Sequence, residues 1–159
     1  MQISRTIIIP VFILLFAAVI LNLTYRSQAT SPKVYTSFYL NGKSYNITAI
    51  AVTEAQQIHG LMNTTISNST IMLFEFPVLG IYPFWMYDTY SNLDMLWLNA
   101  SGGSGTVVYI ESNATSCLVL AKCLNQTYTP NALANYVIEA KAGFVQRNGI
   151  SVGDKITLK

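Results

Sequence analysis

The residues of this chain whose types could support chemistry form a short aromatic and acidic run near its middle. Trp85, Tyr87 and Asp88 lie within four positions, and Asp94 follows shortly after them. Glycoside hydrolysis requires a pair of carboxyl groups, and aromatic rings beside such a pair offer apolar faces for sugar rings. We therefore treat Trp85, Tyr87, Asp88 and Asp94 as a candidate ligand patch.

An alternative interpretation assigns the same side chains to structure. Trp85 and Trp97 lie near Leu93 and Met95, a composition typical of core filling. Asp94 opens an apolar stretch after a turn, where a carboxylate commonly accepts backbone N–H groups. This interpretation is the simpler one, so we assign no catalytic residue. The patch requires Asp88 and Asp94 to face one open cleft.

Other patterns typical of enzymes are missing from the sequence. His59 is the only histidine, and it lies near the end of a predicted surface helix. The serines lack a Gly-x-Ser-x-Gly setting, and the acidic residues form no spaced set of metal ligands. Gly102-Gly103-x-Gly105 lacks the helix and the Lys that follow a phosphate-binding loop. We predict neither a cofactor nor a metal.

The distribution of charge bears on the class of partner. The chain has nine basic and seven acidic residues, and no basic cluster alternates with aromatic residues. Nucleic-acid binding depends on such a basic surface. We therefore predict no nucleic-acid partner.

The amino-terminal segment has the pattern of a membrane span. Residues 6–25, twenty in all, carry no charge and lie between Arg5 and Arg26. A helix of this length rises about 30 Å, which matches the hydrocarbon core of a bilayer. We predict a signal-anchor or transmembrane helix at residues 1–25, a polar tether at 26–33 and one domain at 34–159. A signal peptide cleaved near Ala29 is the alternative, and it would give a secreted protein.

Asn-x-Ser/Thr triplets occur more often than chance predicts. Seven are present, whereas random placement of 12 Asn and 28 Ser and Thr residues predicts about two. The excess indicates an N-glycosylated domain outside the membrane, although an Asn- and Thr-rich composition could also produce triplets by accident. We exclude Asn22 because it lies at the membrane boundary. The predicted sites are Asn46, Asn63, Asn68, Asn99, Asn113 and Asn125.

Cys117 and Cys123 are the only cysteines. In an exported domain, two cysteines six positions apart in a polar segment indicate a local disulfide. A metal-binding pair is the competing interpretation, but His59 is distant in the sequence and no other soft ligand is present.

Short apolar runs and turn signals predict a domain dominated by strands. Asn41-Gly42 predicts the turn of a hairpin within Val34 to Val52, and Thr53 to Gln56 matches the capping box of a short helix that ends at Gly60. Further strands are expected at residues 71–76, 93–99, 106–111, 135–141 and 155–158, with a helical turn at 142–148. We expect a mainly β (β-rich α+β) domain, compact, antiparallel and barrel-like, with one or two short helices besides the amino-terminal helix.

A series of short motifs resembles one known family. The ordered matches are Gly60-Leu61-Met62, Met72-Leu73-Phe74, Phe84-Trp85-Met86 with Thr89, Leu93-Asp94, Cys123, Tyr128, Tyr136-Val137-x-Glu139, Gly143 and Gly149-Ile150-x-x-Gly153-Asp154. Over about residues 34–159 the chain is similar to domain of unknown function 192. The resemblance implies a small, mostly antiparallel β fold that is often exported, and it implies no activity.

The chain departs from that family at recognisable positions. Asn63 stands where the family usually has Arg, Tyr87-Asp88 stands for Lys-Asn, and Asn92 replaces Pro. Two basic groups are therefore absent, which makes binding of an anion at these positions doubtful.

These observations favour a binding or scaffolding function over catalysis. We expect a single-pass protein of the cell membrane whose carboxyl-terminal domain is extracytoplasmic, with a glycan or an envelope protein as partner. The alternative is a carbohydrate-active enzyme or lectin-like domain that uses the patch at Trp85, Tyr87, Asp88 and Asp94.

Overall fold

The computed structural model describes residues 34–159, of which Tyr35–Lys159 form one compact unit. The predicted membrane segment at residues 1–25 and the tether at 26–33 lie outside the described residues. Within residues 34–159, no helix is long and apolar enough to cross a bilayer.

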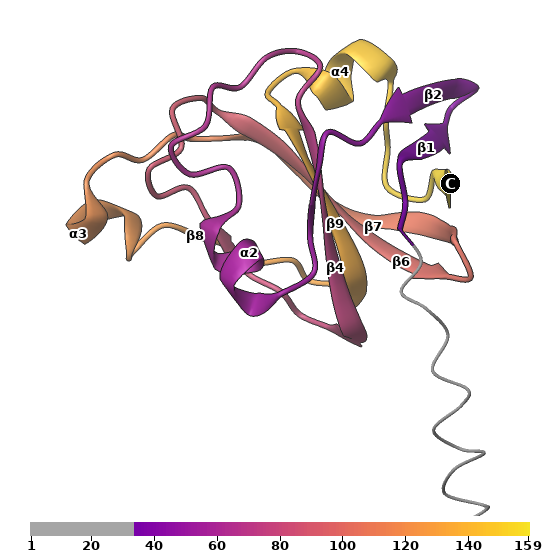
Figure 1. Cartoon of the computed structure of the whole chain (residues 1–159), viewed down its shortest axis with the longest axis horizontal. Coiled ribbons are helices and arrows are strands. Elements are labelled where there is room, and N and C mark those ends of the chain that lie inside the picture. The colour runs from indigo at the N-terminus through magenta and orange to yellow at the C-terminus, as the bar shows by residue number, and fades with distance from the viewer. Residues whose placement is uncertain (1–33) are drawn as a thin grey trace, which may run out of the picture. The chain divides into compact units, whose positions relative to one another are not determined.

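One eight-stranded sheet organises the domain. Its strands lie in the order β2-β1-β10-β7-β6-β9-β4-β3, and a separate pair joins β5 to β8. Figure 1 shows the long strands crossing the middle of the domain, with β1 and β2 at one end and α2, α3 and β8 at the other. The bounds are β1 Ser37–Leu40, β2 Lys43–Asn46, β3 Ala49–Ala51, β4 Ile71–Gly80, β5 Phe84–Trp85, β6 Leu93–Ser101, β7 Ser104–Ala114, β8 Thr127–Tyr128, β9 Ala134–Lys141 and β10 Lys155–Leu158.

Three short helices complete the domain, and they are α2 Glu54–His59, α3 Leu120–Cys123 and α4 Phe144–Asn148. The capping box of α2 forms as predicted, because Thr53 Oγ1 accepts from the Gln56 amide and the Gln56 side chain accepts from the Thr53 amide. Sequence patterns did not predict α3, β5 or β8, which are too short to show a period.

The predicted barrel does not close, and the sheet is open. All strand pairs are antiparallel except β3 with β4, which is parallel. The edge strands β2 and β3 follow each other in the chain, and only Ile47 and Thr48 separate them. The Ile47 amide donates to Thr36 O (2.9 Å) at one edge, and the Thr48 amide donates to Ile71 O (2.8 Å) at the other. The connection brings the edges near each other without a ladder between them.

Strands β4, β6 and β9 lie inside the sheet, and residues 71–74, 93–98 and 136–140 on them are buried. The apolar runs at 71–76 and 93–99 predicted burial on both faces for β4 and β6, whereas the alternation at 135–141 predicted one apolar face for β9. Successive residues alternate between two core clusters, so that Leu73 and Ile138 belong to one cluster, whereas Phe74 and Val137 belong to the other. Burial of both faces excludes water from these strands and makes any charged side chain on them costly.

Two local predictions are confirmed by the structure. Asn41 and Gly42 form the hairpin turn with φ values of 49° and 78°, which Asn and Gly tolerate best. Cys117 and Cys123 form a disulfide with an S–S distance of 2.08 Å. It closes the loop that contains α3.

Asp94 holds two segments to the start of β6. This side chain is 1% exposed. Its Oδ1 accepts from the Asn113 amide (2.9 Å) at the end of β7, and its Oδ2 accepts from the Val145 amide (2.8 Å) in α4. Asp94 is therefore a structural residue, as its position after a turn suggested.

The substitution Asp94→Asn tests this role. An amide has one acceptor oxygen, so one of the two backbone N–H groups loses its partner, and we expect the free energy of unfolding to fall by about 2 kcal/mol. Asp88→Asn is the matched control, because Asp88 has a φ of 53°, which Asn also adopts readily. Thermal unfolding of the full-length chain followed by circular dichroism should show a melting temperature several degrees lower for Asp94→Asn alone. Equal melting temperatures for the two variants would contradict this role.

Candidate functional site

The clearest candidate site lies where α2 ends above strand β9. Gly60 follows α2 with φ 49° and ψ −130°, a conformation that side chains rarely permit. A Cβ atom at this position would lie 3.4 Å from the Phe74 ring and 3.9 Å from Glu139 Oε2. The chain therefore passes close over Glu139, and glycine permits both the conformation and the approach.

Glu139 is a buried acid without a partner. It lies on β9 directly opposite Met72 of β4 and Met95 of β6, and its side chain is 3% exposed. Its Oε2 atom is buried and has no hydrogen-bond partner. Loss of hydration penalises the carboxylate and raises the pKa of Glu139 to about 8. The carboxyl group is therefore mostly protonated at neutral pH.

A small pocket surrounds this carboxyl group. Its volume is about 20 Å³, enough for one group the size of a water molecule. The end of α2, the segment after it, and the residues of β5 and the following turn supply the walls. The lining residues are Gln57, Ile58, His59, Gly60, Leu61, Met62, Phe74, Phe84, Trp85, Tyr87, Thr89 and Glu139.

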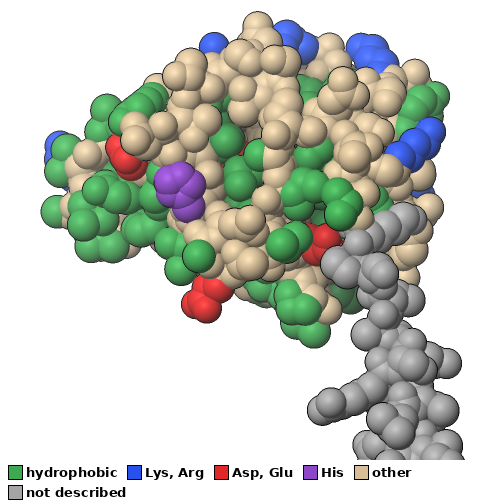
Figure 2. Space-filling view, in the orientation of Figure 1, with side chains coloured by type: hydrophobic (Ala, Val, Ile, Leu, Met, Phe, Trp, Pro, Cys, Tyr) green, Lys and Arg blue, Asp and Glu red, His purple; other side chains and the backbone are tan. Residues whose placement is uncertain are grey.

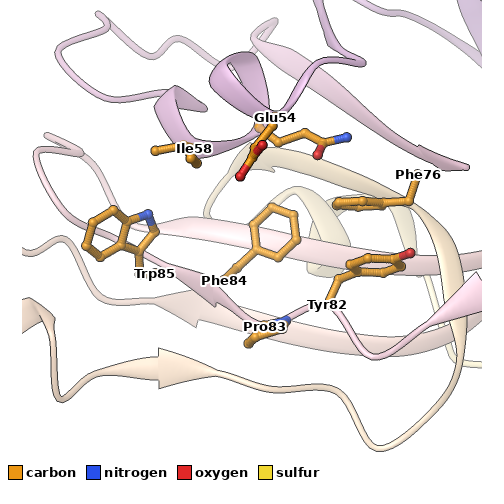
Figure 3. A pocket seen from close by; sticks show the side chains of 8 residues that line it. Glu54, Ile58, Phe76, Tyr82, Pro83, Phe84 and Trp85 are labelled. Carbon is orange, nitrogen blue, oxygen red and sulfur yellow. The ribbon is translucent and has the colours of Figure 1, made fainter.

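A wider groove of about 210 Å³ adjoins the pocket and shares Gln57, Ile58, Phe84 and Trp85 with it. Figure 3 shows Glu54 and Ile58 of α2 on one side and the segment from Tyr82 to Trp85 on the other. Phe76 also lines the groove. We call this hollow the aromatic groove.

Buried contacts hold the groove's walls in place. The rings of Phe76 and Tyr82 stack at 3.7 Å between centroids, and Trp97 Nε1 donates to Tyr82 O (2.8 Å). On the opposite wall, Gln57 Nε2 donates to Glu75 O (2.7 Å), which ties α2 to β4. The groove is therefore preformed by contacts with the core.

The side chains that line the groove and the pocket are mostly apolar, and the charged ones are mainly acidic. The groove contains Glu54 and the pocket contains Glu139, and no Lys or Arg lines either hollow. Figure 2 shows Lys and Arg mostly along the upper and right edges of this face, away from α2. The site therefore presents no basic group that would attract an anion, apart from His59 at the pocket.

The structure brings together half of the predicted ligand patch. Trp85 and Tyr87 line the pocket, with their ring centroids 5.6 Å apart. Asp88 lines neither hollow, and its backbone bonds Cys117 and Asn63. Asp94 is bonded to backbone amides, so Asp88 and Asp94 do not form the carboxylate pair that a hydrolase would need. Tyr87 lies at a position where the resemblance implies Lys.

Glu139 is the residue that sequence reasoning missed. The sequence includes it in the Tyr136-Val137-x-Glu139 motif but gives it no role. The available signal was an acidic residue between Ile138 and Ala140 in a strand apolar on both sides. Because β9 is a central strand, that pattern places a carboxyl group in the core.

The six predicted glycosylation sites all carry exposed side chains. Asn63 Oδ1 accepts from Tyr90 Oη (2.8 Å), and Asn113 Oδ1 accepts from Asn92 Nδ2 (3.0 Å). These bonds use the amide oxygen, whereas a glycan is attached to the amide nitrogen. None of the six asparagines lines the pocket or the aromatic groove. In residues 34–159 no group of three potential metal ligands is present.

The buried acid predicts a specific pH dependence of stability. A solvated Glu has a pKa of about 4.3, whereas burial raises the pKa of Glu139 to about 8. Between about pH 5 and about pH 8 the folded chain retains a proton that the unfolded chain releases, so the free energy of unfolding falls as the pH rises. Glu139→Gln should remove this fall and stabilise the protein at about pH 8 by a few kcal/mol.

Melting temperatures of the full-length chain across this pH range provide the measurement. Glu54→Gln is the control, since Glu54 is exposed and its loss should leave the pH dependence intact. His59 lines the same pocket and remains in both variants, so the difference between wild type and Glu139→Gln isolates Glu139. An unchanged pH dependence in Glu139→Gln would contradict the burial argument.

Comparison with known proteins gives a family and a fold. The family model DUF192, described as an uncharacterized ACR, matches residues 39–158. One similar crystal structure is that of a protein from Sinorhizobium meliloti 1021 described as a candidate transcription regulator, which is 28% identical in sequence and has a TM-score of 0.64. The match covers 80% of this chain and 98% of that protein's chain. A protein of unknown function from Novosphingobium aromaticivorans DSM 12444 is 24% identical with a TM-score of 0.63, and covers 81% of this chain and 94% of its own.

No curated protein matches the chain. The family match nevertheless spans nearly the whole described domain, including Gly60, Trp85 and Glu139, which meet at the pocket. This chain therefore belongs to the DUF192 family, a domain of unknown function.

Proposed function

We propose that this protein is a membrane-anchored, N-glycosylated, extracytoplasmic module that binds a small ligand in the aromatic groove. The observation that carries the proposal is the continuity of the groove with the pocket at Glu139. The two share four residues, and the pocket ends at a buried carboxyl group whose Oε2 has no partner. A preformed apolar hollow with a few polar groups is the usual form of a ligand site.

The location of the module rests on two features of the sequence. The uncharged segment at residues 6–25 is long enough to span a bilayer, and six exposed asparagines occupy glycosylation triplets in the folded domain. If both features act as proposed, the groove faces the outside of the cell.

Binding is favoured over catalysis by the arrangement of the carboxyl groups. Glycoside hydrolysis uses two carboxyl groups that flank one scissile bond. Asp94 is engaged by two backbone amides. Glu54 is exposed at the groove, whereas Glu139 is buried at the pocket. One acid in the pocket can position a ligand, but this arrangement lacks the paired acid and base.

A carbohydrate is the second candidate that a specific observation favours. Tyr82, Phe84 and Trp85 line one wall of the groove, and the opposite wall carries the Gln57 amide and the Glu54 carboxylate. Aromatic rings facing polar groups across a narrow hollow suit a ring that is apolar on its face and polar at its edge. The volume of about 210 Å³ limits the bound part to a small group.

Mass spectrometry of glycopeptides from the native protein tests the location. We expect glycans at one or more of the six exposed triplets and none at Asn22, because only the folded domain would face the glycosylation machinery. Asn131 and Asn135 lie in the same domain outside any triplet and serve as internal controls. A complete absence of glycans from all six triplets would contradict the proposed orientation.

Binding of mono- and disaccharides to the full-length chain in nanodiscs tests the groove. Tyr82→Ala removes a ring that lines the groove, and we expect the Kd of any bound saccharide to rise about tenfold. Tyr39→Ala is the matched control, since Tyr39 is an exposed tyrosine on β1 and does not line the groove. Equal affinities in both variants would exclude the groove. Failure of every saccharide to bind would exclude carbohydrate as the ligand class.

A further inference from the structure

The pocket at Glu139 has the features of a built recognition site. The side chain is almost completely buried, Glu139 lines the pocket, and its Oε2 has no hydrogen-bond partner. Leaving a buried polar atom unpaired costs free energy. Strand β9 is paired with β4 and β6 through Met72 and Met95, which holds the backbone at Glu139 inside the sheet. A group in the pocket could supply the partner that Oε2 lacks.

The walls of the pocket select the charge of that partner. Phe74, Phe84, Trp85 and Tyr87 bring aromatic rings to the pocket, and the faces of such rings attract cations. A carboxylate attracts a cation as well, and neither Lys nor Arg lines the pocket or the groove. His59 is the one basic side chain at the pocket. An organic cation therefore finds more attractive groups in this pocket than an anion does.

The size of the pocket narrows the cation further. About 20 Å³ accommodates one group the size of a water molecule. A primary ammonium has one heavy atom and three donors, and it fits this space. A trimethylammonium group has four heavy atoms and does not fit. A single water molecule is the competing occupant.

We propose that the Glu139 pocket binds the primary ammonium group of a small amine whose ring-bearing body lies in the aromatic groove. The inference rests on the proposed function, because it takes the groove as the binding site. The ammonium donates to Glu139 Oε2, and the rings of Phe84 and Trp85 flank the remaining donors.

Binding of the amine is coupled to the release of one proton. In the empty pocket, burial keeps Glu139 mostly neutral at pH 7 because its pKa is about 8. When the ammonium enters, the carboxyl O–H bond breaks and its proton passes to solvent, leaving a carboxylate paired with the ammonium. The other titratable groups that line these hollows are His59 and Tyr87 in the pocket and Glu54 and Tyr82 in the groove.

The test uses 2-phenylethylamine as the probe and 2-phenylethanol as its neutral match. Isothermal titration calorimetry of the full-length chain in nanodiscs gives the Kd of each compound as a function of pH. We expect the amine to bind at least tenfold more tightly than the alcohol, because a charge-assisted hydrogen bond replaces a neutral one. Its Kd should fall roughly tenfold from pH 6 to pH 7, as deprotonation of Glu139 becomes easier.

Two variants separate this inference from the proposed function. Glu139→Gln should raise the Kd of the amine at least tenfold at about pH 8 and abolish the pH dependence of binding that we assign to Glu139. Glu54→Gln should retain that pH dependence. Tyr82→Ala should raise the Kd of the amine and of the alcohol by a similar factor, because both compounds place a ring in the groove.

Each result has a defined meaning. If amine and alcohol bind equally and both depend on Tyr82, the groove is a ligand site and the ammonium inference is wrong. If the amine depends on Glu139 but not on Tyr82, the pocket binds ammonium and the groove proposal is wrong. An amine that does not bind at millimolar concentration, or that binds Glu139→Gln as tightly as wild type, overturns the inference and leaves a water molecule as the occupant.

Discussion

The position of β9 in the interior of the sheet is the constraint on which the candidate site depends. Both of its edges are paired, with β4 on one side and β6 on the other, and five consecutive residues from Tyr136 to Ala140 are buried. The backbone of an acidic residue on such a strand is held in place by both neighbouring strands, so its side chain stays in the core. Any event that hydrates or pairs Glu139 must therefore occur in the segments that cover it, which are the end of α2 and the residues after β5.

Those covering segments differ in how firmly they are held. Helix α2 has no fully buried residue, and its capping box and its bond from Gln57 to Glu75 hold it mainly through polar contacts. The turn after β5 is held more tightly, because Cys117 bonds to both Met86 and Asp88 and is itself joined to Cys123. Helix α2 is therefore the less firmly held of the two walls, since few buried apolar contacts anchor it.

The sequence predicted the features whose causes are local. The Asn41-Gly42 turn, the capping box at Thr53 and the disulfide each depend on a few neighbouring residues, and all three form. Closure of the sheet would require a ladder between its edge strands β2 and β3, which are joined in the chain but not paired, so the expectation of a barrel was wrong. The burial of Glu139 likewise follows from the pairing of β9 with β4, in which its partner Met72 lies more than sixty residues earlier in the chain. Trp85 and Tyr87, which line the pocket, could be named as candidates from their residue type, whereas the role proposed for Glu139 depends on its environment.

Two of the glycosylation triplets lie away from the aromatic groove. Asn46 and Asn68 line a separate hollow with Tyr45 and Phe144, side chains that pack with the core cluster on the opposite face of the central strands from Phe74. Glycans at these two asparagines would cover that hollow and hinder a partner from docking there. Asn46 also lies on the edge strand β2, where a bulky glycan would oppose pairing with another sheet. No triplet asparagine is among the lining residues of the aromatic groove or the pocket.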